Sequence, residues 1–81
     1  MDMNVAREWL VTLTEDVTHV DAAADALAAR HGFAVSARIG VLRSFVATMT
    51  NATIAQVRRE PSVTRILRNL RLRASARLVT V

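Results

Sequence analysis

The segment from Phe45 to Val63 constrains the fold most, because it contains a strand, a capped helix and the start of another strand in direct succession. Its first apolar residues alternate at the period of a strand: Phe45, Ala47 and Met49. Thr50 then stands where a helix N-cap is expected, and Ile54 and Val57 repeat at helical spacing before Pro61 ends the helix. This order predicts one βαβ half of a small sheet.

The same order occurs once earlier in the chain. The run from Glu8 to Leu13 predicts a strand, and the alanine-rich run from His19 to His31, closed by Gly32, predicts a helix. The following apolar residues again alternate: Phe33, Val35, Ala37 and Ile39. The order β, α, β, β, α, β predicts an α+β sandwich in which two helices pack on one face of a four-stranded antiparallel sheet.

The ends of the predicted elements carry their own signals. The sequence Thr18-His19-Val20-Asp21 has the spacing of a capping box with Thr18 as the N-cap, and Gly32 suits the left-handed position after a helix. His31 beside it favours the helix C-terminus when charged, which is a structural rather than a catalytic role. The stretch 40–44 is short enough for a hairpin with Gly40 at its bend, so the strands on either side should be antiparallel neighbours.

Composition excludes several classes of protein. A chain of 81 residues, 52% of them apolar, can form one small domain of modest stability. It has no cysteine and two histidines, so we expect neither a disulfide framework nor a metal site, and nothing indicates a cofactor. The N-terminus lacks an apolar signal core and no run is long enough to span a membrane. If Met1 is the natural start the protein is expected in the cytoplasm, and if the chain is an excised pro-segment it is expected to be secreted.

Charge is distributed unevenly along the chain. All 11 basic residues are arginine. Most of them follow Val57, where Glu60 is the only acid: Arg58, Arg59, Arg65, Arg68, Arg71, Arg73 and Arg77. In the first 32 residues the acids outnumber the arginines. The pattern predicts an acidic helix and a basic end, which is either a solvated surface or a match for an acidic partner or a nucleic acid.

Two short motifs and their spacing resemble a known family. The motifs are Phe45-Val-Ala-Thr-Met49 and Glu60-Pro61-Ser62-Val63, and the run from Glu8 to Leu13 looks like the opening strand of the same family. In these features the chain is similar to the subtilisin propeptide and inhibitor I9 family, whose members carry an apolar strand, a Ser/Thr-capped helix and an acidic-Pro-x-Val turn. The resemblance covers roughly Glu8 to Leu67, and none of its motifs is catalytic.

The resemblance implies a ferredoxin-like βαββαβ domain that is not an enzyme. Such a domain packs the open face of its sheet on a subtilisin-like serine protease, in cis or in trans, and acts as an inhibitor and folding assistant. On this basis residues 1–7 form an N-terminal extension, 8–69 the inhibitor domain and 70–81 an extended tail of a monomeric protein. The outward sheet positions expected to dock are Leu10, Val46 and Thr48, although the first strand is apolar on both faces and does not itself reveal which face is outward.

The same resemblance implies that the C-terminal segment occupies the protease cleft like a product, through main-chain hydrogen bonds. Two registers are open. By family spacing the cleft segment is Leu72, Arg73, Ala74 and Ser75, whereas a free C-terminus would place Leu78, Val79, Thr80 and Val81 there. The second register is slightly favoured, because processed members of the family end where they were cut.

One position departs from the family pattern. Bacterial propeptides carry acids just after the last strand, where they meet helix N-termini on the protease, and this chain has Leu67-Arg68-Asn69 there. Arginine opposes the positive end of a helix dipole. Either the partner differs from an ordinary subtilisin, with a more acidic surface, or the fold serves another binding role.

Three other functions compete with inhibition. A basic, nucleic-acid-binding module would stack bases on strand aromatics, but Trp9 and Phe45 are better explained as core residues. Enzymatic activity would need a base and an acid near a nucleophile, and the serines at 36, 44, 62 and 75 show no such spacing. An interaction domain could instead add a strand through the alternating Leu70 and Leu72.

Overall fold

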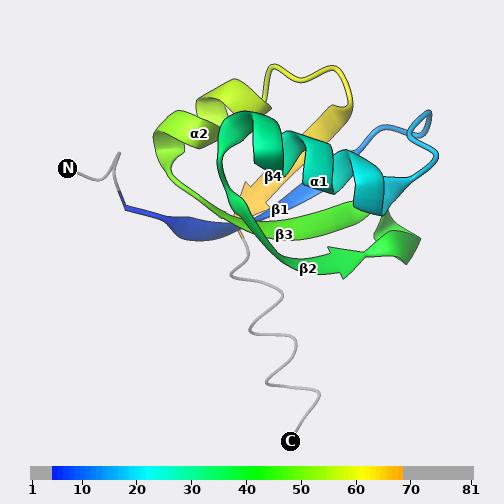
Figure 1. Ribbon diagram of the computed structural model, residues 1–81, viewed down its shortest axis with the longest axis horizontal. Helices are drawn as coiled ribbons and strands as arrows, with labels where there is room; N and C mark the ends of the chain where they lie inside the picture. The colour runs from blue at the N-terminus through cyan, green and yellow to red at the C-terminus, as the bar shows by residue number, and fades with distance from the viewer. Residues whose placement is uncertain (1–4, 69–81) are drawn as a thin grey trace, which may run out of the picture.

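The computed structural model describes residues 5–68, and it has the predicted βαββαβ order (Figure 1). The elements are β1 (Arg7–Leu13), α1 (Val20–His31), β2 (Ala34–Ile39), β3 (Ser44–Met49), α2 (Asn51–Val57) and β4 (Val63–Arg68), with a 3₁₀ turn at Gly40–Leu42 between β2 and β3. The strands form one antiparallel sheet in the order β2-β3-β1-β4. The two helices cover one face of this sheet, so the ferredoxin-like α+β architecture is confirmed.

The core lies between the helices and that face of the sheet. Every second residue of the central strands β1 and β3 points into it, as the strand period requires: Val11, Leu13, Phe45, Ala47 and Met49. The helices contribute Ala24 and Leu27 from α1 and Ile54 and Val57 from α2. Burying a large apolar side chain contributes about 1.5–3 kcal/mol, so these residues supply most of the stability of so short a chain.

Two predicted helix ends are confirmed. The hydroxyl of Thr50 accepts a hydrogen bond from the backbone N–H of Thr53 at 3.2 Å and so caps α2. Gly32 adopts a left-handed conformation, φ 71°, and its N–H donates to the carbonyl of Ala28 at the end of α1. Both ends were readable from the sequence because the groups that satisfy them are adjacent in the chain.

The predicted capping box of α1 is wrong. The N-cap is His19 rather than Thr18, and no side chain caps this helix end. With the helix starting at Val20, Asp21 lies too early in the first turn to complete the box. It instead faces β2, where its carboxylate lies 3.6 Å from Nε of Arg38. Asp21, which its spacing from Thr18 assigned to the helix cap, therefore forms an ion pair with Arg38 of β2 instead.

The β2–β3 connection is a hairpin, as predicted, but its left-handed residue is not a glycine. Gly40 opens the 3₁₀ turn, whereas Arg43 has φ 52° and donates its N–H to the carbonyl of Gly40. A left-handed non-glycine residue is energetically unfavourable and is held here by other contacts. The Arg43 guanidinium supplies them by donating to the carbonyls of Thr14, Glu15 and Val17 in the β1–α1 loop.

Candidate functional site

The face of the sheet opposite the helices carries a continuous apolar row. Residues paired across antiparallel strands point to the same side, and one set of such pairs joins Ala37, Val46, Leu10 and Leu67, one from each strand. We call these four residues the apolar row. Val46 at its centre is nearly buried, at 4% exposed, whereas Leu67 at the β4 end is 47% exposed. Solvent exposure along the row thus increases from its buried centre to its β4 end.

Mostly polar residues flank the apolar row on both sides, with Ile39 and Ala34 at the β2 end. One neighbouring set of pairs joins Ile39, Ser44, Thr12 and Arg65, and the other joins Ala34, Thr48 and Glu8. Within the first set the Ser44 hydroxyl donates to the carbonyl of Leu42, which leaves Thr12 to donate to Ser44 at 2.9 Å. An apolar centre with polar borders is the usual composition of a protein-docking patch.

The three predicted docking residues therefore lie on one face. Leu10 and Val46 are paired in the apolar row, and Thr48 follows in the adjacent set. The structure also decides which face of β1 is outward, because Trp9, Val11 and Leu13 all pack toward the helices. Sequence reasoning missed Leu67 and Ala37, which complete the row from the edge strands.

Both omissions have the same cause, an irregularity in each edge strand. Thr12 pairs with Arg65 but Leu13 pairs with Val63, so Thr64 is an extra residue in β4. Likewise Val35 pairs with Ala47 and Ala37 with Val46, so Ser36 is extra in β2. Each extra residue reverses the alternation that follows it, and simple alternation assigns Leu67, Ala37 and Ile39 to the wrong face.

The aromatic side chains point away from the open face. Phe45 is fully buried and stacks on Phe33, with ring centroids 5.9 Å apart. Trp9 packs against the core and its indole N–H donates to the carbonyl of Met49 at 3.1 Å. The assignment of Trp9 and Phe45 to the core is confirmed, and neither offers its ring on the open face for base stacking.

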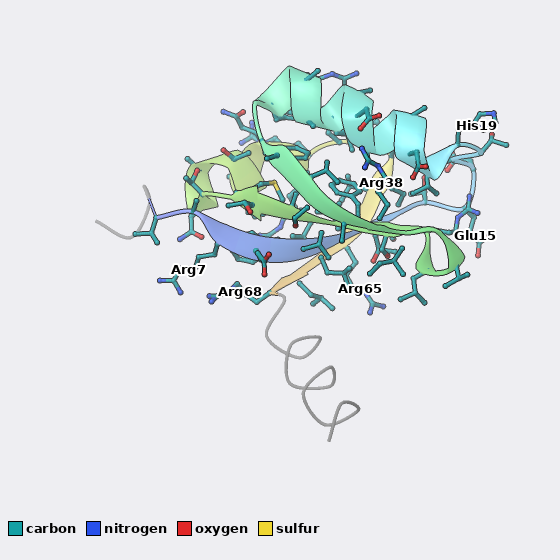
Figure 2. The ribbon with its side chains drawn as sticks, turned by 60° about the horizontal axis from the view of Figure 1, so that its bottom comes forward. Arg7, Glu15, His19, Arg38, Arg65 and Arg68 are labelled. Carbon is teal, nitrogen blue, oxygen red and sulfur yellow. The ribbon has the colours of Figure 1, made fainter. Side chains whose placement is uncertain are left out.

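Basic groups gather at the β4 side of the molecule. Figure 2 shows Arg7, Arg65 and Arg68 on the side away from α1, whereas Arg38 lies beneath that helix. Arg68 extends over the Trp9 ring at 5.5 Å, a cation–π contact. Arg38 pairs with Asp21 and Asp25, which uses acids of α1 within the domain. The β4 side therefore carries the net positive charge of the described domain.

A cluster of three charged or titratable side chains joins the end of α1 to the loop before β4. Both carboxylate oxygens of Glu60 accept from Arg30 Nη1 at 2.8 Å, and Oε2 also lies 2.6 Å from Nε2 of His31. The His31 and Glu60 side chains are 11% and 12% exposed. The hydrogen bond with His31, followed by the one from Arg30, holds the pKa of Glu60 below its usual range. His31 thus contacts Glu60, a partner distant in the sequence that the expected role at the helix C-terminus did not include.

The predicted cleft segments lie outside the described residues. These are Leu72 to Ser75 and Leu78 to Val81, and the tail assigned to 70–81 lies there too. Within residues 5–68 no helix is long and apolar enough to cross a membrane. The same residues contain no group of side chains arranged to hold a metal ion. Neither the family models nor the curated proteins include a match to this chain.

Proposed function

We propose that this protein binds a subtilisin-like serine protease and inhibits it or assists its folding. The observation that carries the proposal is the apolar row on the sheet face opposite α1 and α2. A half-exposed leucine such as Leu67 gains little from folding alone, whereas a partner that removes it from water gains the apolar transfer free energy, roughly 25 cal/mol per Å². The row is continuous across all strands, so it suits one broad partner surface.

The direction of the chain supports a second contact. β4 is an edge strand, and it continues directly into residues 69–81, where the sequence places the proposed cleft segment. A domain docked through its sheet would raise the effective concentration of that segment near the protease cleft. The tail would then bind as an extended strand with main-chain hydrogen bonds, as a product does.

The rim of the face adds a preference for the partner's charge. Arg65 ends the polar set beside the apolar row, at the β4 edge of the open face. A protease surface with carboxylates opposite this end would be favoured over the helix N-termini that acidic propeptides meet. We therefore propose a protease whose docking surface is more acidic than that of ordinary subtilisins.

The test measures inhibition of a panel of subtilisin-like proteases by the full chain. Leu67→Asp should raise the inhibition constant about tenfold or more, because a charge on an apolar row that the protease covers is left desolvated. Val41→Asp is the matched control, since Val41 is 92% exposed at the hairpin tip and lies off the row. Deleting Leu78 to Val81 should weaken inhibition without changing the circular dichroism spectrum.

Two results would contradict the proposal. One is that no protease of the panel is inhibited and each cleaves the chain as an ordinary substrate. The other is equal inhibition by the Leu67→Asp and Val41→Asp variants. Binding to oligonucleotides that falls steeply with salt would instead favour the basic nucleic-acid-binding alternative, because phosphate contacts release counterions.

A further inference from the structure

The outer side of β4 borders a groove that shares Arg65 with the docking face but lies outside the apolar row. The groove measures about 280 Å³ and lies between the end of α2 and the first half of β4. Its lining combines two arginines with strand residues: Arg58, Val63, Thr64, Arg65 and Ile66. A space of this size accommodates a side chain or two rather than a whole drug-sized ligand, for which pockets start near 300 Å³.

The strand beside the groove can accept another strand. β4 pairs with β1 on one side only, so its other side presents backbone N–H and C=O groups with no strand partner in the part of the chain that the structure describes. Such an edge is a template for an added strand. The extra residue Thr64 interrupts this edge at its start, which leaves Arg65 to Arg68 as the regular stretch for pairing.

The groove has an apolar floor and a basic rim. Val63 and Ile66 are half-buried and pack against the core, so they form the floor. Arg58 and Arg65 are exposed, and neither has an ion pair with any of residues 5–68. Arg58, which has no carboxylate partner within residues 5–68, favours a carboxylate at this groove, because a carboxylate can accept from one guanidinium in a bidentate geometry.

We propose that this edge binds an extended peptide segment of a partner protein in which an apolar residue is next to Asp or Glu. The segment would add a strand along Arg65 to Arg68, place its apolar side chain over Val63 and Ile66, and direct its carboxylate to Arg58. The proposal does not rest on protease inhibition, because the edge and the apolar row are different surfaces of the sheet.

The charge of β4 argues against a second copy of this chain as the occupant, and the position of the aromatic rings argues against a nucleic acid. Antiparallel pairing of β4 with β4 of a second copy would bring the arginines of both chains together, and like charges across strands are destabilising. A nucleic acid would also match the arginines, but single strands bind through stacking on aromatic rings, and Trp9, Phe33 and Phe45 pack toward the core. An acidic peptide satisfies the charges, the backbone edge and the apolar floor together.

The experiment titrates the full chain with a fluorescein-labelled peptide of alternating Leu and Glu and follows anisotropy and backbone amide NMR shifts. We expect saturable binding with the largest shifts in residues 64–68, and no binding of the same peptide with Gln in place of Glu. Arg58→Gln should weaken binding about tenfold, as expected for loss of a charge-assisted hydrogen bond. Arg59→Gln is the matched control, because Arg59 is the neighbouring exposed arginine and does not line the groove.

Several outcomes would overturn the proposal: equal binding of the Gln peptide, equal weakening by the Arg58→Gln and Arg59→Gln variants, or shifts confined to the apolar row. Tighter binding of an oligothymidylate than of the peptide would assign the arginines to nucleic acid. A dimer in light scattering that Arg58→Gln leaves unchanged would assign the edge to self-association. Protease inhibition by the Arg58→Gln variant should remain unchanged, which separates this proposal from the preceding one.

Discussion

The central and edge strands of the sheet are held in place by different forces. β1 and β3 keep perfect alternation, and their inward residues are almost all buried. β2 and β4 each contain an extra residue, and they are tied to α1 by polar contacts, through Arg38 in β2 and through Glu60 just before β4. The centre thus depends mainly on packing, whereas the edge strands add polar contacts to the packing of Val35, Val63 and Ile66. The β4 edge also carries the most exposed residue of the apolar row, Leu67, and borders the groove beside α2.

The extra residues explain why Ala37 and Leu67 lie on the open face. Each irregular edge strand keeps an early residue in the core and moves a later one to the open face: Val35 and Ala37 in β2, and Val63 and Leu67 in β4. A regular β4 would instead direct Arg65 toward the helices and Ile66 outward. The extra residue thus keeps an arginine out of the core and extends the apolar row to the sheet edge.

The largest effect on the free energy of unfolding should come from a substitution in the central strand β3. Phe45→Ala removes a fully buried ring that stacks on Phe33, and we expect it to lower the free energy of unfolding by about 3–5 kcal/mol. Thr48→Ala, in the same strand but exposed, is the control and should change it by less than about 0.5 kcal/mol. Urea unfolding followed by circular dichroism measures both. Similar losses for the two variants would contradict the packing account of the central strands.

Neighbouring residues in β4 give the next largest effect and test the register directly. Ile66 packs against the core and Leu67 is 47% exposed on the other face, so Ile66→Ala should cost about 2 kcal/mol and Leu67→Ala less than about 1 kcal/mol. The two midpoints in urea give the comparison. A reversed order would mean that β4 alternates regularly and that Leu67 does not belong to the apolar row.

The smallest effect on the free energy of unfolding should come from the charge of Glu60, just before edge strand β4. Because His31 and Arg30 lower the pKa of Glu60 in the folded protein, the carboxylate binds protons more weakly there than in the unfolded chain. The stabilisation is therefore complete above the ordinary pKa of 4.5 and is lost as the pH falls through that value toward the lower folded pKa. The difference in free energy of unfolding between the wild type and Glu60→Gln should therefore decrease as the pH is lowered from about 7 to about 3.

Urea midpoints of both proteins across that range provide the measurement. Asp21→Asn is a useful comparison, because this carboxylate is exposed and lies 3.6 Å from Arg38, so its removal should change stability much less. A difference between the wild type and Glu60→Gln that stays constant with pH would show that Glu60 contributes through packing rather than through its charge.

The sequence by itself determined the order of the elements, the alternation within the central strands and the ends of the helices at Thr50 and Gly32. These features depend on residues close together in the chain. They are alternation within a strand, a hydroxyl that accepts a hydrogen bond from the amide three residues later, and a glycine after the last helical turn. The clustering of arginines near the C-terminal end was equally visible, because it is a matter of composition.

Only the tertiary structure decided the outward face, the registers of β2 and β4 and the partners of Asp21, His31 and Arg43. Each of these depends on a group distant in the chain, and local spacing carries no information about it. An extra residue such as Thr64 is defined only against the strand it pairs with, because the partner fixes which residues lie opposite one another. The apolar row and the β4 groove both follow from that pairing, which is why the docking surface could be foreseen only in part.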